Sequence, residues 1–160
     1  MNILNGLHGT PALLLLCGLL FAEEAGVPLP FAPGELVVLA GGLLVATGGL
    51  NPFIFIPAAI VACIAGSLLG FGWASAVGPT GLRKIAGKLH QEKALDKVEQ
   101  RVTAAGPVGI GISRLIPGLR IYTTLVAGAL RIERRTFLVG IVPTTVGWVL
   151  TFAILGAVVG

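Results

Sequence analysis

The chain has 160 residues, 55% of them hydrophobic and 11% charged, and its formal net charge is +4. Soluble domains carry roughly 25% charged residues, so this composition, with a mean hydropathy of +0.96, excludes an ordinary soluble enzyme and a nucleic-acid-binding domain. We expect an all-α integral membrane protein with a single domain over residues 1–160. We expect no nucleic acid partner, no cofactor and no metal.

The first predicted element is a re-entrant helical hairpin over residues 11–50. One apolar helix should begin at Pro11 and end at about Glu24, and a second apolar run covers 36–49. Each is too short to cross a hydrocarbon core of about 30 Å at about 1.5 Å per residue. The glycine and the three prolines within 26–33 prevent a continuous helix. One long kinked span is the alternative, but the number of consecutive helix breakers favours the hairpin.

A membrane span and an amphipathic helix follow. Residues 52–77 are apolar and long enough to cross the membrane. Over 81–104, apolar residues recur at helical spacing with cations on the other faces, which predicts an amphipathic helix at the cytoplasmic surface. Its charges most simply form a solvated face beside a membrane, and recognition of lipid headgroups or RNA is the less favoured interpretation.

A second re-entrant hairpin is predicted over 106–130 and a final span over 136–159. Basic clusters within 83–101 and 131–135 flank this hairpin on both sides. Because cytoplasmic loops are rich in Lys and Arg, both of its ends should be cytoplasmic. The first hairpin lacks Lys and Arg and should enter from outside. The two hairpin-and-span halves then form an inverted repeat, an architecture of secondary transporters that have their site near the midplane.

Two arginines mark this predicted site. Arg114 and Arg120 lie six residues apart, in a run over 102–130 that is otherwise uncharged. A guanidinium stays charged at any reachable pH. At bilayer depth, each arginine therefore needs an acidic partner, backbone carbonyls or water. We expect the chain itself to supply acidic partners.

Carboxylates on both sides of the first helix break are the expected partners. Glu23 precedes the break and Glu35 follows it, and we predict that these two acids bind substrate and protons together with the two arginines. Glu24 points about 100 degrees away from Glu23 on a helix and is a secondary candidate. The structural alternative is a set of ion pairs that only joins the two hairpins. The other secondary candidates stand at or beside the hairpin tips: Pro33, Gly34, Pro117, Gly118 and Tyr122.

These motifs resemble the DedA family, also described as the SNARE-associated Golgi protein or VTT-domain family. The resemblance covers roughly residues 15–155. Family members often have Gly-Asp where Gly66 is followed here by Ser67, so the chain lacks an acid at that position. The matching segments are Phe21-Ala22-Glu23, Pro33-Gly34-Glu35, Ser113-Arg114-Leu115-Ile116-Pro117-Gly118-Leu119-Arg120 and Val126-Ala127-Gly128.

The resemblance implies a multi-pass protein of the inner (plasma) membrane with two facing re-entrant hairpins. It also implies a lipid transporter linked to the proton motive force, with a polyprenyl phosphate such as undecaprenyl phosphate, or a phospholipid, as the lipid partner. A guanidinium pair suits this task because it binds phosphate oxygens bidentately. We expect the headgroup to compete with the carboxylates for Arg114 and Arg120, and protonation of the acids to release the arginines.

Other functions use the same residues. A proton- or cation-coupled transporter of small solutes is one alternative, and a phospholipid scramblase is another. We do not expect an enzyme, because the sequence has no Gly-x-Ser-x-Gly elbow and no His-Glu-x-x-His motif, and His8 and His90 lie outside the apolar segments. The glycine-lined spans could pack within one chain or between copies of it in a homo-oligomer.

Overall fold

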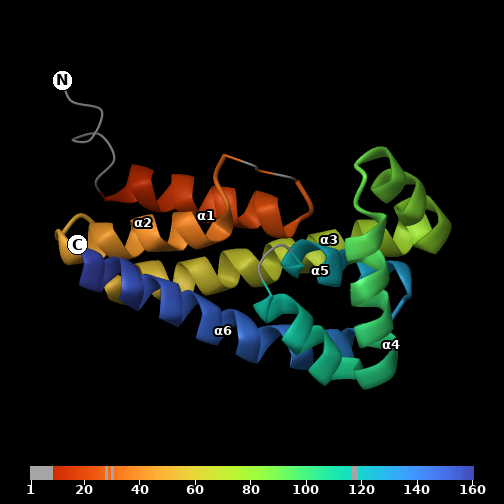
Figure 1. The fold of residues 1–160 in the computed structure, drawn as a ribbon. Helices are drawn as coiled ribbons and strands as arrows, with labels where there is room; N and C mark the ends of the chain where they lie inside the picture. The colour runs from red at the N-terminus through yellow and green to blue at the C-terminus, as the bar shows by residue number, and fades with distance from the viewer. Residues whose placement is uncertain (1–8, 28, 30, 117–118) are drawn as a thin grey trace. The chain divides into compact units, whose positions relative to one another are not determined.

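A computed structural model describes residues 9–27, 29, 31–116 and 119–160. Over these residues the chain forms six helices and no strand (Figure 1), which confirms the predicted all-α class. The helices are α1 (Thr10–Glu24), α2 (Gly34–Ala46), α3 (Pro52–Lys88), α4 (Glu92–Leu115), α5 (Arg120–Ala129) and α6 (Arg134–Val159).

Two of these helices, α3 and α6, are long and apolar enough to cross a membrane. The apolar α2 has only 13 residues, and α1 has 15. At about 1.5 Å per residue, neither can cross a core of about 30 Å. The helices that flank the proline-rich break are therefore short, as the sequence predicts.

Two long helices bend where glycine takes a conformation that other residues avoid. In α3 the backbone of Gly78 has φ 77 and ψ 176, and in α4 that of Gly106 has φ 55 and ψ −127. Only glycine adopts such positive φ values readily. Pro107 follows the second bend, where its missing N–H makes the interruption inexpensive. The first bend coincides with the predicted end of the span over 52–77.

The predicted amphipathic helix over 81–104 is corrected by the structure, because it is not continuous. His90 has φ 56, and the N–H of Gln91 donates to the carbonyl of Ala86 at 2.9 Å. This left-handed cap ends α3 before α4 begins. Histidine is among the side chains that tolerate this backbone region. The apolar spacing in the sequence does not show the break, because Leu82 of α3 and Leu95 of α4 pack into the same core.

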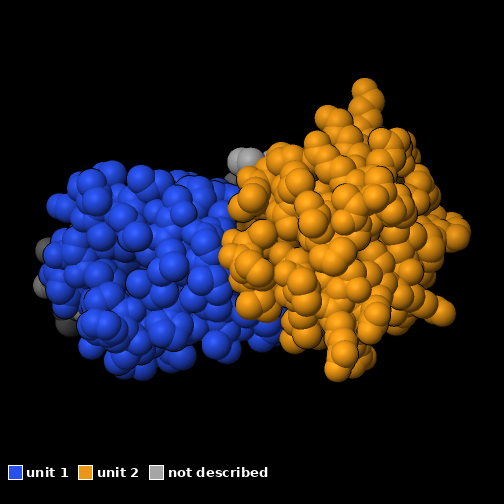
Figure 2. Space-filling model, turned by 90° about the horizontal axis from the view of Figure 1, so that it is seen from below, with its two compact units in different colours: residues 1–23, 27–66, 145–160 blue, residues 24–26, 67–144 orange. Residues whose placement is uncertain are grey.

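The chain divides into two compact units, coloured separately in Figure 2. Unit 1 consists of residues 1–23, 27–66 and 145–160, and unit 2 of residues 24–26 and 67–144. The division passes through α3 and through α6, so each long helix contributes one part to each unit. The single predicted domain over 1–160 thus contains two separately packed bodies.

In unit 1, α1 and α2 form an antiparallel pair (Figure 1). The N–H of Gly9 donates to the carbonyl of Gly49 at 2.9 Å, which joins the start of α1 to the end of α2. Glycines let α2 pack against the C-terminal part of α6: a Cβ on Gly42 would collide with the carbonyl of Ala153. This is the close backbone approach that small residues permit between apolar helices.

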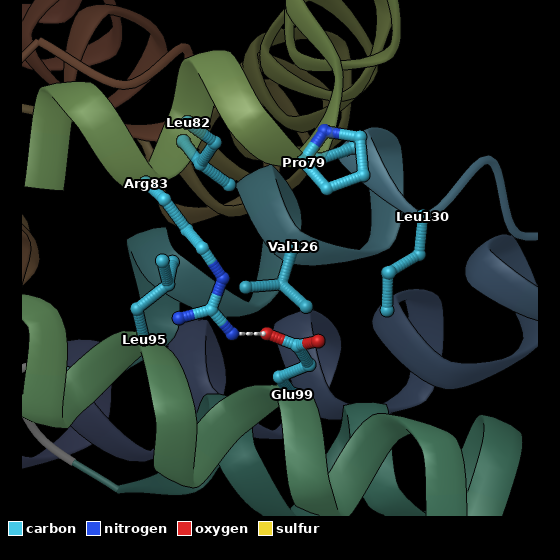
Figure 3. Close-up of a pocket in the computed structure, with 8 residues that line it drawn as sticks. Pro79, Leu82, Arg83, Leu95, Glu99, Val126 and Leu130 are labelled. Carbon is cyan, nitrogen blue, oxygen red and sulfur yellow. Dashed lines mark hydrogen bonds and ion pairs between the residues drawn. The ribbon is translucent and has the colours of Figure 1, made fainter.

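In unit 2, segments of α3, α4, α5 and α6 share one hydrophobic core. The rings of Phe71 and Phe137 lie 4.7 Å apart within it. At the surface, Arg83 pairs with Asp96 at 3.0 Å and with Glu99 at 2.6 Å. The cavity beside this ion pair (Figure 3) has a volume of only about 10 Å³. That space holds about one water molecule, so the ion pair joins α3 to α4 and does not line a ligand site.

Replacing Gly128 by alanine should destabilise unit 2. A Cβ at this position would stand 2.9 Å from the Cα of Phe71, so the backbones of α5 and α3 would have to separate. Overpacking of this kind costs about 1–3 kcal/mol, measurable by thermal unfolding of the purified protein in detergent. Gly72→Ala is the matched control, because nothing lies within 4 Å of its Cβ position. Equal stability of the two variants would contradict this close approach.

Candidate functional site

The buried polar cluster of unit 2 is centred on Glu24, the last residue of α1. Its side chain is completely buried. One carboxylate oxygen, Oε1, lies 2.7 Å from Nε of Arg120. The other, Oε2, lies 3.2 Å from Nη2 of Arg114. Glu24, Arg114 and Arg120 are called the charged triad below.

Two hydroxyl groups complete the hydrogen bonding around the charged triad. Ser67 of α3 donates its hydroxyl to Oε2 of Glu24 at 2.6 Å. Thr124 of α5 accepts a hydrogen bond of 3.0 Å from Nη1 of Arg114. Both hydroxyl-bearing residues are fully buried. The Glu24 carboxylate therefore accepts from three side chains, and Arg114 donates to two different partners.

The break between α4 and α5 brings both arginines to this cluster. Arg114 lies in the last turn of α4, and Arg120 is the first residue of α5. Ile116 between them is extended, with φ −83 and ψ 121, as expected before a proline. On α5, Arg120 and Thr124 are four residues apart and share a face. A continuous helix would turn the two arginines away from each other, because residues six apart on a helix point about 120 degrees apart.

Backbone contacts hold Glu24 in place. The indole N–H of Trp73 donates to the carbonyl of Ala25 at 2.6 Å, which fixes the chain just after the carboxylate. Gly70 leaves room for this chain, because a Cβ there would lie 2.9 Å from the carbonyl oxygen of Glu24. The end of α1 is thus fixed on α3 by one hydrogen bond and one glycine contact.

The charged triad combines two positive charges and one negative charge in a site that is almost closed to solvent. Arg114 is 3% exposed and Arg120 is 6% exposed. Removing such groups from water is expensive, and only charge pairing and hydrogen bonding offset the cost. The three groups together carry a formal charge of +1. Chemically, the cluster can exchange one carboxylate partner for another anionic group.

The other two predicted acids, Glu23 and Glu35, belong to unit 1. Glu23 is nearly buried, at 9% exposed. Glu35 is half-buried in the first turn of α2, and no hydrogen bond or ion pair joins its side chain to another described residue. Within unit 2, the secondary candidate Glu24 pairs with both arginines.

The remaining secondary candidates that the structure describes are Pro33, Gly34 and Tyr122. Pro33 is the N-cap residue of α2, and Gly34 is the first residue of that helix. Tyr122 is half-buried and packs against the core of unit 2. Pro117 and Gly118 lie outside the described residues.

Ser67 and Thr124 were not among the predicted site residues. Each had a signal in the sequence: Ser67 occupies the position where the DedA pattern often has an acid, and Thr124 follows Arg120 by one helical turn. In this chain the hydroxyl of Ser67 serves the carboxylate of Glu24 as a donor. An acid in its place would instead add a second negative charge beside the first.

Comparisons with known proteins agree with these observations. A family model described as the VTT domain matches residues 30–158. Protein DedA of Escherichia coli K12 is 26% identical over 151 residues, which cover 93% of this chain and 69% of that protein. An uncharacterized membrane protein of Synechocystis is 32% identical over 119 residues, covering 72% of this chain and 52% of its own length. No solved structure matches significantly.

A third relative, an uncharacterized membrane protein of Mycobacterium leprae, is 25% identical over 105 residues, which cover 66% of this chain and 47% of that protein. The chain thus spans about half the length of this relative and of the Synechocystis one. The names of these relatives as membrane proteins agree with the presence of two helices that are long and apolar enough to cross a membrane. The predicted resemblance to the DedA family is confirmed. The chain is a membrane protein and belongs to the VTT-domain (DedA) family.

Proposed function

We propose that this chain moves a lipid phosphate across the inner membrane, with undecaprenyl phosphate or a related polyprenyl phosphate as substrate. The observation that carries the proposal is the charged triad, in which two buried arginines both pair with the carboxylate of Glu24. Ionisable groups at membrane depth usually mark substrate or proton pathways. A phosphate headgroup is the anionic partner to which paired guanidinium groups are best suited.

The membrane arrangement that goes with this proposal is multi-pass. In it, α3 and α6 cross the bilayer, while the pairs α1–α2 and α4–α5 enter as two opposed re-entrant hairpins. Irregular backbone at bilayer depth persists only where it is buried in protein or lines a cavity. Arg114 and Arg120, on either side of the break between α4 and α5, are buried, which supports this arrangement.

The proposed transport step is an exchange of partners. The phosphate oxygens replace the carboxylate of Glu24 on Arg114 and Arg120, and the displaced carboxylate takes up a proton. The N–H groups in the first turn of α5, which begins at Arg120, add further donors for an anion. Loss of that proton on the other side restores the ion pairs and expels the headgroup. This exchange links lipid movement to the proton motive force.

Glu23 and Glu35 keep their predicted role within this proposal as groups that carry protons to or from Glu24. Both acids stand near the break that follows α1, where Glu23 directly precedes Glu24 and Glu35 opens α2. Buried or half-buried carboxylates are suited to proton transfer when a neighbouring group changes charge. Neither acid is required to contact the phosphate.

A complementation experiment tests the proposal. In cells that lack this protein, the amount of undecaprenyl phosphate exposed on the cell surface should differ from the amount in cells that have it. Expression of the wild type should restore the original amount. Arg114→Ala should fail to restore it, because the variant loses the donors to both Glu24 and Thr124. We expect at least about a tenfold loss of transport, since one charged hydrogen bond contributes about 1.5–3 kcal/mol.

Arg135→Ala is the matched control, because Arg135 is exposed on α6. It should restore surface undecaprenyl phosphate as well as the wild type does when both are present at equal levels. Full restoration by Arg114→Ala at equal protein level would remove this arginine from the transport site.

A further inference from the structure

An open groove lies at the bend of α4, away from the charged triad. It has a volume of about 280 Å³, and the segments before and after Gly106 both contribute to it. Four of its six lining residues are small or apolar. The lining residues are Gln100, Arg101, Ala104, Ala105, Gly109 and Ile112.

The charge in this groove comes from Arg101, which is half-buried. Its Nη1 atom is buried and has no hydrogen-bond partner among the described residues. The nearby acids of α4, Asp96 and Glu99, are instead paired with Arg83. A guanidinium held against an apolar wall without a carboxylate is unfavourable unless an anion joins it.

The side chains around the groove change from basic to apolar along α4. Lys93, Lys97 and Arg101 are spaced four residues apart, so they lie on one side of the helix before the bend, and both lysines are exposed. After the bend, Val108 is 64% exposed and Ile112 is 51% exposed. This order, basic and then apolar, is the order of headgroups and acyl chains in a membrane leaflet.

We propose that this groove binds one anionic phospholipid of the surrounding membrane. The phosphate lies at Arg101 and Lys97, and an acyl chain lies along Ala105, Gly109 and Ile112. Charge complementarity selects an anionic headgroup, and the apolar lining selects a lipid over a free phosphate ion. The site goes beyond the proposed transport function and does not rest on it, because none of its residues belongs to the charged triad.

The test is direct binding of phosphatidylglycerol to the purified full chain in detergent, measured by native mass spectrometry with phosphatidylcholine as the neutral comparison. The wild type should prefer phosphatidylglycerol. Arg101→Gln should weaken its binding about fivefold, the effect of losing one cation near an anionic lipid. Ala104→Trp, which fills the groove and keeps the charge, should weaken the binding of both lipids.

Arg135→Gln is the control for net charge, because it removes one exposed arginine of α6 and should leave binding unchanged. Inorganic phosphate at tens of millimolar should not displace the lipid. The proposal is overturned if Arg101→Gln binds phosphatidylglycerol like the wild type, if Arg135→Gln loses as much, or if inorganic phosphate competes fully. Because Arg101→Gln leaves the charged triad intact, the result is independent of the transport assay.

Discussion

Glu24→Gln is expected to destabilise the protein by about 3–5 kcal/mol, the usual effect of removing one partner from a buried ion pair. Glutamine keeps the shape of the side chain and its contact with Ser67, but it removes the only negative charge in the charged triad. Arg114 and Arg120 would then repel each other in a site where they are 3% and 6% exposed. Equilibrium unfolding of the purified protein in detergent measures the change.

Glu35→Gln is the matched control for this prediction. Glu35 is half-buried, and its side chain makes no hydrogen bond or ion pair with another described residue, so its loss should change stability by no more than about 0.5 kcal/mol. Under the proposed function the same variant slows proton-linked transport, which separates its functional effect from folding. Equal stability of Glu24→Gln and Glu35→Gln would show that the buried ion pairs do not stabilise the fold.

Arg120→Lys is expected to reduce lipid transport by roughly 10–100-fold while it retains the positive charge. The guanidinium binds Glu24 through Nε at 2.7 Å, and a guanidinium holds its N–H groups in a rigid planar fork that matches phosphate oxygens. Lysine offers one compact charge and cannot bind two oxygens in this fork geometry. Losing one charged hydrogen bond costs about 1.5–3 kcal/mol. Added to the activation free energy of transport, this cost corresponds to the expected range of rates.

The initial rate of lipid-phosphate movement in proteoliposomes measures this effect. Arg134→Lys, an exposed position on α6, provides the same substitution outside the site and should transport normally. Normal transport by Arg120→Lys would rule out bidentate capture of the phosphate, although a simple electrostatic role for the two arginines would survive.

Much of the fold followed from local rules that act on single residues. Glycine and proline restrict or extend the allowed backbone angles whatever surrounds them, so the breaks near Gly26, Gly78 and Gly106 could be predicted. All three glycines have positive φ. The turn at His90 could not be predicted in this way, because histidine tolerates the left-handed region but does not require it, and the apolar spacing continues across the turn.

The need for a charged site was also readable from the sequence, since Arg114 and Arg120 cannot lose their charge and had to meet partners at bilayer depth. The choice of partner was not readable. Helix α1 is apolar on nearly every side before Glu23, so no periodicity shows that Glu24 faces the arginines. The structure places Glu24 there, because Trp73 and Gly70 hold the end of α1 against α3.

By itself, the sequence determined the helical class, the positions of most breaks, the family and the two arginines, because each depends on local backbone chemistry, composition or motif. Only the tertiary structure decided that Glu24, Ser67 and Thr124 complete the cluster. Ser67 lies 43 residues from Glu24, and Arg114 lies 90 residues from it. Contacts over such separations depend on how several helices pack together, and no local pattern encodes that.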